Sequence, residues 1–350
     1  MHMSKSSSYI ALNLLLQQVL EGDLLPDNLS NLRIGMLRAR PHPDLARLAR
    51  HPVVGSLSLQ STFKPDVNAL QALGLTVSES FGGVFDVMLF VPTRQRRESL
   101  ACYVEALQML RPGGRLIVSC ANDMGAPSYE KALRQLAGLR GARSKAHSRL
   151  FWTEASGEID PALAAEWVKA AEPSTVPGTD FVTVPGIYGW QKIDQGSQLL
   201  AKFLPENLSG SGMDLGCNYG YLAHALLSRA SGVTCLHLVE AEARALACAR
   251  TNLAMFASVD LRYHWLDVAE THIEHLDFVL LNPPFHAGKE TDYQLGKSFV
   301  ETACRSLRRG GRLFMVANQF LSYEDVLARE LSRHERLTLE NGFKVLAGVK

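Results

Sequence analysis

The chain has 350 residues, 47% of them hydrophobic and 20% charged, and a formal net charge of +1. This length exceeds one average domain and leads us to expect two, each large enough to bury a substantial core. No apolar run reaches the roughly 18 residues that a membrane span requires, so we expect no membrane association.

The cysteines and histidines do not indicate a metal site. All six cysteines stand singly in the sequence, without a Cys-x-x-Cys pair, which argues against a zinc site and a disulfide framework. We therefore expect no metal and a reducing, cytoplasmic location. His264, His272 and His275 also lack other metal ligands nearby, and we interpret them as solvated surface residues.

The first half of the chain is basic. Residues 1–150 hold 18 Lys+Arg against 11 Asp+Glu, or +7, whereas residues 151–350 hold 18 against 24, or −6. This asymmetry favours contact between the first half and a polyanion. The candidate phosphate contacts are six cations of this half: Arg94, Arg96, Arg97, Arg143, Lys145 and Arg149. A purely solubilising role is the alternative.

The chain changes character at residues 172–179, where two prolines, a glycine and small polar residues indicate a linker. We place one domain at 1–172 and the other at 180–350. In the second domain, strands are predicted at 212–216, 233–239, 278–281 and 312–317, and helices at 221–229, 241–256 and 297–307. This alternation predicts an α/β fold with a parallel, doubly wound sheet that binds ligands at the carboxyl ends of its strands.

The two domains repeat one pattern of strand, turn, helix, Gly-Gly turn and strand. Residues 85–92 and 110–119 correspond in this pattern to residues 276–283 and 307–316. We therefore predict two tandem Rossmann-like domains of one fold. The first domain has an amphipathic helix at 9–20 and an opening strand at 32–37 but no glycine-rich loop after that strand. We interpret it as a degenerate copy that serves as a binding platform.

The second domain carries a glycine-rich loop where a strand meets a helix, at Asp214-Leu-Gly-Cys-Asn-Tyr-Gly220. Its glycines permit a tight turn and a close approach of a ligand to the backbone. Glu240 ends the next strand, where its carboxylate can accept hydrogen bonds from both ribose hydroxyls. Asp267 follows a strand at 261–266 and suits an adenine amino group. These features, in this order, predict a nucleotide-like cofactor.

The strongest catalytic motif is Asn282-Pro-Pro-Phe285, directly after the strand at 278–281. Two prolines fix φ and remove two amide donors, so this backbone presents carbonyl groups. The Asn282 side-chain oxygen and the Pro283 carbonyl can both accept from one NH2 group and hold its nitrogen toward a sulfonium methyl. Phe285 offers a face on which a flat base can stack. We interpret His286 as a supporting hydrogen bonder rather than a base.

Four segments resemble a known family: Val184-Pro-Gly-Ile-Tyr188, Ile193-Asp-Gln-Gly-Ser-Gln-Leu-Leu200, Asp214-Leu-Gly-Cys217 and Asn282-Pro-Pro-Phe-His286. They resemble the bacterial ribosomal RNA guanine-N2 methyltransferases, above all the RsmC-like enzymes of the small subunit, with the RlmG-like enzymes of the large subunit second. The resemblance is strong over 181–350 and weaker but collinear before it, where the family carries a degenerate methyltransferase domain thought to assist RNA binding. It implies S-adenosyl-L-methionine-dependent methylation of a guanine N2 amino group in 16S ribosomal RNA.

The resemblance also implies roles for single residues. The cofactor would be held by Asp214, Gly216, Asn218, Gly220, Glu240 and Asp267, with Gln198 in a loop over its methionine end and Asn282 at its methyl end. Asn282, Pro283 and Phe285 would hold the guanine amino group, with His286 beside them. The family usually has a glycine where this chain has Asn218. Because asparagine is the non-glycine residue most tolerant of positive φ, we expect the loop to keep its shape.

Other functions stay open on the residues alone. Asn-Pro-Pro-aromatic loops also serve adenine N6 and the glutamine amide of proteins, although Phe285, in place of the more usual tyrosine, and the duplicated first half favour guanine. A guanine of 23S ribosomal RNA is a further alternative. A non-catalytic RNA-binding protein with two inactive domains is a different class, which the intact acidic residues disfavour. We expect a monomer whose partner is ribosomal RNA within the small subunit.

Overall fold

The computed structural model of the chain describes residues 7–25, 30–155, 159–284 and 290–350. The chain divides into two compact units, Met1–Glu172 and Pro173–Lys350. Each unit is an α/β structure built on a seven-stranded, mostly parallel sheet. The predicted fold class is confirmed.

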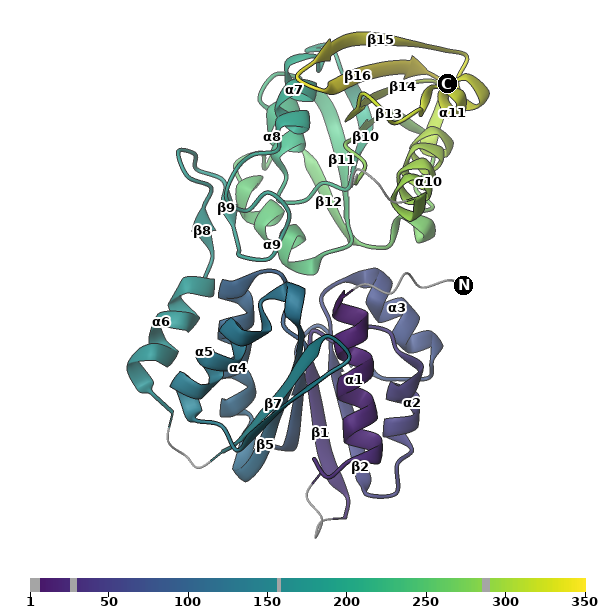
Figure 1. The fold of residues 1–350 in the computed structure, drawn as a ribbon. Helices are drawn as coiled ribbons and strands as arrows, with labels where there is room; N and C mark the ends of the chain where they lie inside the picture. The colour runs from purple at the N-terminus through teal and green to yellow at the C-terminus, as the bar shows by residue number, and fades with distance from the viewer. Residues whose placement is uncertain (1–6, 26–29, 156–158, 285–289) are drawn as a thin grey trace. The chain divides into compact units, whose positions relative to one another are not determined.

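The first unit has helices on both faces of its sheet (Figure 1). Its amphipathic helix and opening strand are confirmed as α1 and β1, and β1 has the predicted bounds. The elements, in chain order, are α1 (Ser7–Glu21), β1 (Leu32–Leu37), α2 (Pro43–Ala49), β2 (Val54–Gln60), α3 (Lys64–Ala72), β3 (Val77–Ser78), β4 (Phe85–Phe90), α4 (Arg96–Gln108), β5 (Leu110–Ala121), η1 (Asn122–Met124), α5 (Ala126–Ala137), β6 (Gly141–Lys145), β7 (Ser148–Glu154) and α6 (Pro161–Ala171).

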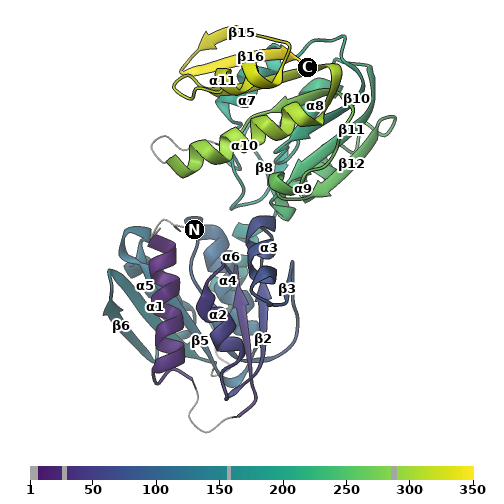
Figure 2. The same ribbon diagram turned by 90° about the vertical axis from the view of Figure 1, so that its right-hand side faces the viewer.

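The second unit is built in the same way, with α10 and α11 on one face of its sheet (Figure 2). All its predicted strands and helices are present, but some ends differ: the helix predicted at 297–307 begins at Glu290, and the strand predicted at 312–317 begins at Leu307. The elements are β8 (Ser174–Thr175), β9 (Val182–Thr183), α7 (Gln195–Lys202), β10 (Ser209–Leu215), α8 (Tyr221–Leu227), β11 (Gly232–Glu240), α9 (Ala243–Asn252), β12 (Asp260–Trp265), η2 (Val268–Glu270), β13 (Leu276–Leu281), α10 (Glu290–Ser306), β14 (Leu307–Asn318), α11 (Glu324–Glu330), β15 (Arg333–Glu340) and β16 (Phe343–Val349).

The two sheets have the same strand order. The first runs β3-β2-β1-β4-β5-β7-β6 and the second β12-β11-β10-β13-β14-β16-β15, which is the same permutation when each sheet is numbered from its own first strand. In both sheets the second-to-last strand of this order, β7 or β16, is antiparallel to its inner neighbour, β5 or β14. The repeat predicted from the sequence is therefore a repeat of topology.

The central strands are apolar on both faces, because helices cover both. In β13, Phe278 and Leu280 pack into the cluster under α7, α8 and α9, whereas Val279 and Leu281 pack into the cluster under α10 and α11. Strands buried on both faces are expected as nearly continuous apolar runs rather than alternating ones. Such rigid strands hold the loops at their carboxyl ends in fixed positions.

The predicted linker contains ordered structure of its own. β8, which lies within 172–179, pairs with β9 as a short antiparallel ladder, and Val176 is buried against Trp190 and its neighbours.

The boundary between the units also changes the charge balance. Counted to residue 172, the first unit holds 19 Lys+Arg against 16 Asp+Glu, or +3, and the second 17 against 19, or −2. The sign of the asymmetry persists, but it is smaller than a division at 150 indicates.

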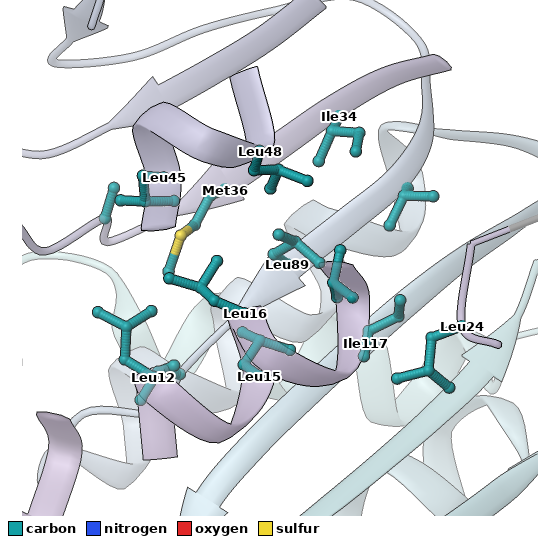
Figure 3. Close-up of a cluster of buried hydrophobic side chains, with 14 of the residues drawn as sticks. Leu12, Leu15, Leu16, Leu24, Ile34, Met36, Leu45, Leu48, Leu89 and Ile117 are labelled. Atoms are coloured by element: carbon teal, nitrogen blue, oxygen red, sulfur yellow. The ribbon is translucent and has the colours of Figure 1, made fainter. Parts of the chain in front are cut away.

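Leu16 tests the core of the first unit. It is fully buried in α1, where it packs with side chains of β1, α2 and β4 (Figure 3). We expect Leu16→Ala to lower the free energy of unfolding by about 2–5 kcal/mol, because the substitution leaves a cavity. The control is Val168→Ala in α6, where valine is 43% exposed and the expected change is within about 0.5 kcal/mol. Equal effects in urea denaturation would contradict this assignment of the core.

Candidate active site

The candidate site lies at the carboxyl ends of β10 and β13, which are neighbours in the second sheet. The chain leaves β10 toward β11 and β12 on one side and returns to β13 on the other. The loops after β10 and β13 therefore diverge, and open α/β sheets bind ligands at such a switch point. The two motifs singled out in the sequence occupy these two loops.

The loop after β10 turns through three residues with left-handed backbone. Their φ angles are 81° at Gly216, 48° at Asn218 and 87° at Gly220. The expectation that asparagine would keep the shape of the loop is thus confirmed. The Asn218 side chain also makes a contact that glycine cannot, because its Nδ2 donates to the Tyr188 carbonyl at 2.8 Å. This hydrogen bond ties the loop to the segment before α7.

Glu240 ends β11 and faces this loop. Its carboxylate accepts from two backbone N–H groups, those of Asn218 and Glu242, each at 2.8 Å. Burial raises the pKa of Glu240 above its usual value, although the two N–H groups oppose the shift. Each carboxylate oxygen keeps a further lone pair, so Glu240 can still accept two hydroxyl groups.

Asp214 is fully buried in β10. Its Oδ2 accepts from the backbone N–H of Ala223 at 3.1 Å, while its Oδ1 is buried without a hydrogen-bond partner among the described residues. Burial, aided by the charge of Glu240, raises the pKa of Asp214 to about 7. A buried carboxylate oxygen of this kind is costly unless something outside the chain satisfies it.

Asp267 follows β12 and is half-buried. Its Oδ1 accepts from the Ala269 N–H at 3.2 Å and so begins the short helix η2. β10, β11 and β12 are neighbouring parallel strands, so their carboxyl ends lie on the same side of the sheet. Asp214, Glu240 and Asp267 are therefore all near these carboxyl ends. This places the predicted acidic residues in a row beside the glycine loop.

Asn282 follows β13 directly, and both hydrogens of its side-chain amide are engaged. Its Nδ2 donates to Asp194 Oδ2 at 2.8 Å and to Ser197 Oγ at 2.7 Å. A carboxylate only accepts hydrogen bonds, so the amide nitrogen must face Asp194. The amide oxygen is thereby turned away from α7 and stays available as an acceptor. Pro283, next in the chain, is buried and contributes a carbonyl but no N–H.

Asp194 is the centre of the contacts around Asn282. It is the N-cap of α7 and accepts from the Ser197 N–H at 2.7 Å, while its Oδ1 accepts from the Tyr188 hydroxyl at 2.7 Å. Burial and the neighbouring Asp194 raise the pKa of Tyr188, so its hydroxyl remains a donor. Three donors on one carboxylate fix both its position and that of the amide.

The structure brings most of the predicted residues together, with two differences. Gln198 lies exposed on the first turn of α7, and Ser197 makes the contact to Asn282 that the sequence did not predict. A signal for the position of Ser197 was present, because Asp194 stands three residues before it, which is the spacing between an N-cap side chain and the backbone N–H that donates to it. Phe285 and His286 lie outside the described residues.

The histidine prediction is only partly right. His272 and His275 are exposed as expected, but His264 is half-buried and its Nε2 lies 3.0 Å from Nδ1 of His237. The register of β11 and β12 pairs His237 with Arg262, which puts His264 on the same face as a diagonal neighbour. Single-sequence spacing does not reveal this cross-strand pair.

Comparison with known proteins adds to this geometry. Residues 178–347 match the family "Methyltransferase small domain". The ribosomal RNA small subunit methyltransferase C of Sodalis glossinidius is 30% identical over 278 residues, which cover 79% of this chain and 77% of that protein. The protein of the same name from Psychromonas ingrahamii is 28% identical over 75% of each chain.

A solved structure resembles the whole chain. It is the 16S rRNA N2 methyltransferase (RsmC) of T. thermophilus in complex with AdoMet and guanosine, with a TM-score of 0.76 and 24% identity. The match covers 97% of this chain and 91% of that one. This chain belongs to the ribosomal RNA small subunit methyltransferase C family. It is an S-adenosylmethionine-dependent methyltransferase, and the resemblance read from its motifs is confirmed.

In this methyltransferase the first unit lacks the counterparts of the site. In each sheet the last residue of the first strand pairs with the last residue of the fourth strand, which are β1 and β4 in the first unit and β10 and β13 in the second. Val91 directly follows β4, so it occupies in the first unit the position that Asn282 occupies in the second. By the same registers, Ser61 replaces Glu240. An apolar side chain and a hydroxyl thus take the places of the amide and the carboxylate.

Arg38 takes the position of Gly216, the first glycine of the loop after β10. It keeps the left-handed backbone, with a φ of 52°, but carries a long side chain. Its Nε lies 2.9 Å from Glu98 Oε1, and its Nη1 donates to Thr62 Oγ1 at 2.6 Å. Glu98 is buried, so this ion pair is part of the structure of the first unit. In the first unit the Arg38 side chain therefore fills the space that Gly216 leaves open in the second unit.

Asp194→Asn tests whether Asp194 orients the amide of Asn282. We expect kcat of the methyltransferase to fall by about ten-fold or more, because an amide in place of the carboxylate lets the Asn282 amide turn over. The matched control is Asp160→Asn. Asp160 is the N-cap of α6 and accepts from the Leu163 N–H at 2.9 Å, and because asparagine caps a helix about as well, this variant loses only the charge of a capping carboxylate. Equal kcat values for the two variants would refute the orienting role.

The raised pKa of Asp214 predicts a pH dependence of stability. Between its ordinary value of 3.8 and about 7, the unfolded chain is ionised at this group while the folded chain retains the proton. Folding then binds a proton, so stability falls as pH rises through this window and levels off above it. We expect the free energy of unfolding of the wild type, minus that of Asp214→Asn, to decrease from pH 4 to 7.

Asp277→Asn is the control for this measurement. Burial alone would raise the pKa of Asp277, but hydrogen bonds from the Ser211 N–H and Arg308 outweigh it and lower the pKa. Its contribution is lost only below its ordinary value, so the same difference should be flat above about pH 4. A flat difference for Asp214 as well would show that burial does not shift its pKa.

Proposed function

We propose that the second unit transfers a methyl group from S-adenosylmethionine to the N2 amino group of a guanine in 16S ribosomal RNA. The observation that carries this proposal is the orientation of Asn282, whose amide donates both hydrogens to α7 and leaves its oxygen for a donor. An exocyclic amino group is such a donor. The membership of the chain in a small-subunit methyltransferase family supports 16S RNA as its source.

The loop after β10 and the acidic edge fit the cofactor. A Cβ at Gly216 would meet only Phe299, at 3.3 Å, so the glycine leaves room for a ligand against the backbone. The unpartnered Oδ1 of Asp214 suits a cationic amine, and Glu240 suits a pair of ribose hydroxyls. We propose Asp267 for the adenine amino group. When bound, the cofactor supplies a methyl group activated by its sulfonium charge.

The residues of the site position the amino group and stabilise the charge that develops on it. The Asn282 oxygen and the Pro283 carbonyl accept its two hydrogens, which directs the nitrogen lone pair at the methyl carbon. As the nitrogen–carbon bond forms and the carbon–sulfur bond breaks, positive charge grows on the nitrogen. Both acceptors favour that charge. The extra proton then leaves to water, so no strong base is required. We assign stacking of the guanine to Phe285.

The first unit is proposed to contact the phosphates of the RNA. Arg94 follows β4, Arg96 begins α4 and Lys145 ends β6 beside the β6–β7 turn, so these exposed cations gather at the carboxyl edge of the first sheet. Arg143 and Arg149 already pair with Asp23 and Glu130. Phosphate contacts position RNA without reading its sequence. This role would leave the choice of guanine to the second unit.

Two further properties belong to the proposal. We place the protein in the cytoplasm, where ribosomal RNA is modified, and all six cysteines are free thiols, as a reducing compartment requires. No helix among the described residues is long and apolar enough to cross a membrane. We also propose that the chain acts as a monomer, because one chain holds both the site and a phosphate-binding unit.

Asn282→Ala tests the function and the mechanism together. We expect the wild type to add one methyl group to guanine N2 of small subunits from cells that lack the enzyme. The variant should lose about 100-fold in kcat, because one acceptor of the amino group is missing. Mass mapping of the rRNA nucleosides identifies the product. The control is Asn207→Ala, an exposed asparagine before β10.

The outcomes separate the alternatives. When large subunits from the same cells are offered in a parallel reaction, N2-methylguanosine that appears only in their 23S RNA would move the substrate to the large subunit. N6-methyladenosine, or methyl label in protein, would contradict the guanine assignment. Cofactor binding by calorimetry without methyl transfer to any RNA would leave a binding protein.

A further inference from the structure

The second unit has an open cavity of about 560 Å³. It is formed by the segment after β14, by the start of α11 and by β15 and β16. Figure 2 shows α11, β15 and β16 next to one another. Its volume is within the roughly 300–1,000 Å³ of small-molecule sites. None of the residues assigned above to the cofactor or the amino group lines it.

The cavity and Asn282 are neighbours through the sheet. β13 and β14 pair in parallel, with Leu281 opposite Met315, so Pro284 is level with Asn318 at the end of β14. Adjacent strands are about 4.8 Å apart. Phe320, two residues past the end of β14, therefore stands one strand away from the Asn-Pro-Pro segment and beyond its level.

Phe320 is the residue that gives the cavity its chemistry. Its side chain is 82% exposed, the largest exposed fraction among the large hydrophobic residues described. An exposed aromatic ring at the rim of a cavity offers a face on which a flat ligand can stack. The backbone N–H of Phe320 donates to Asn318 Oδ1 at 3.0 Å, which holds the ring on a defined turn.

The remainder of this segment is anchored to α10. The Tyr293 hydroxyl donates to the Ser322 carbonyl at 2.7 Å, and the Tyr293 and Tyr323 rings stack with an angle of 4° between their planes. Tyr323 is fully buried. The turn that carries Phe320 is therefore a rigid part of the unit, which lowers the entropy lost when a ligand binds to it.

The charges of the cavity favour a base over a phosphate. Lys344, only 4% exposed, donates to both oxygens of Glu324 at 2.6 and 2.7 Å, so this pair neutralises itself. Asp325 and Arg336, both exposed, balance each other in sign. A cavity without net positive charge has little attraction for a phosphate. A flat aromatic face with a few polar groups suits a nucleobase instead.

We propose that this cavity is a second base site, in which Phe320 stacks on a nucleobase next to the target guanine in the RNA. The proposal rests on the proposed function and extends it. A guanine that reaches Asn282 must leave its helical stack, and its neighbour then loses a stacking partner. Phe320 replaces that partner and holds the opened strand. The site therefore acts in RNA binding and leaves cofactor binding unaffected.

Phe320→Ala and Phe320→Trp test the stacking. With small subunits as substrate, we expect the alanine variant to raise KM about ten-fold. The tryptophan variant should keep KM close to the wild-type value, because both aromatic rings stack. Cofactor affinity and melting temperature should match the wild type. The matched control is Met255→Ala in the loop between α9 and β12, where methionine is 73% exposed. An unchanged KM, or a loss of cofactor binding, in Phe320→Ala would overturn the proposal.

Photocrosslinking identifies the occupant. With benzoylphenylalanine in place of Phe320, we expect a crosslink to 16S RNA at a nucleotide adjacent to the methylated guanine. A crosslink to a ribosomal protein, or to distant RNA, would overturn the base site while the methyltransferase activity stands. A wild-type protein that transfers no methyl group to RNA would instead overturn the proposed function, and the base site with it.

Discussion

The two hydrogen bonds that the Asn282 amide donates to Asp194 and Ser197 fix the orientation of this side chain, on which the proposed chemistry depends. An amide side chain has a donor end and an acceptor end of nearly equal shape, and only its surroundings decide which end faces a substrate. Here a carboxylate at the start of α7 settles the choice, because it can only accept. The oxygen of Asn282 is thus left available as an acceptor, and the role that we propose for it is a preorganised one.

The duplicated architecture shows which features a fold needs and which a site needs. Both sheets have the same strand order, and the central strands of both are buried on two faces by apolar side chains. The loops at the carboxyl ends carry no such constraint. In the first unit, Arg38, Ser61 and Val91 occupy the loop positions of a glycine, a carboxylate and an amide, and the sheet beneath them is unchanged. Chemistry can therefore be lost without loss of the fold.

The sequence predicted what depends on local pattern. The strands, the glycine loop and the Asn-Pro-Pro segment are each formed by consecutive residues, so local sequence patterns are enough to predict them. The partners of Asn282 were harder to predict, because Asp194 and Ser197 lie more than 80 residues away along the chain and approach it only through the packing of α7 on β14. The contact between His237 and His264 could not be predicted for the same reason, because it depends on the register of two strands. Exposure of Phe320 could not be read from its neighbours either, since Leu321 and Tyr323 beside it are partly or fully buried.

The asparagine in the glycine loop has a thermodynamic consequence. A glycine at position 218 would sample a wide range of backbone angles in the unfolded chain and a moderately wide range in the free loop. Asn218 narrows both, and its side chain anchors the loop to the Tyr188 carbonyl. Because of both effects, the loop after β10 has less backbone freedom with asparagine at position 218 than it would have with glycine, and its cost in conformational entropy is met on folding.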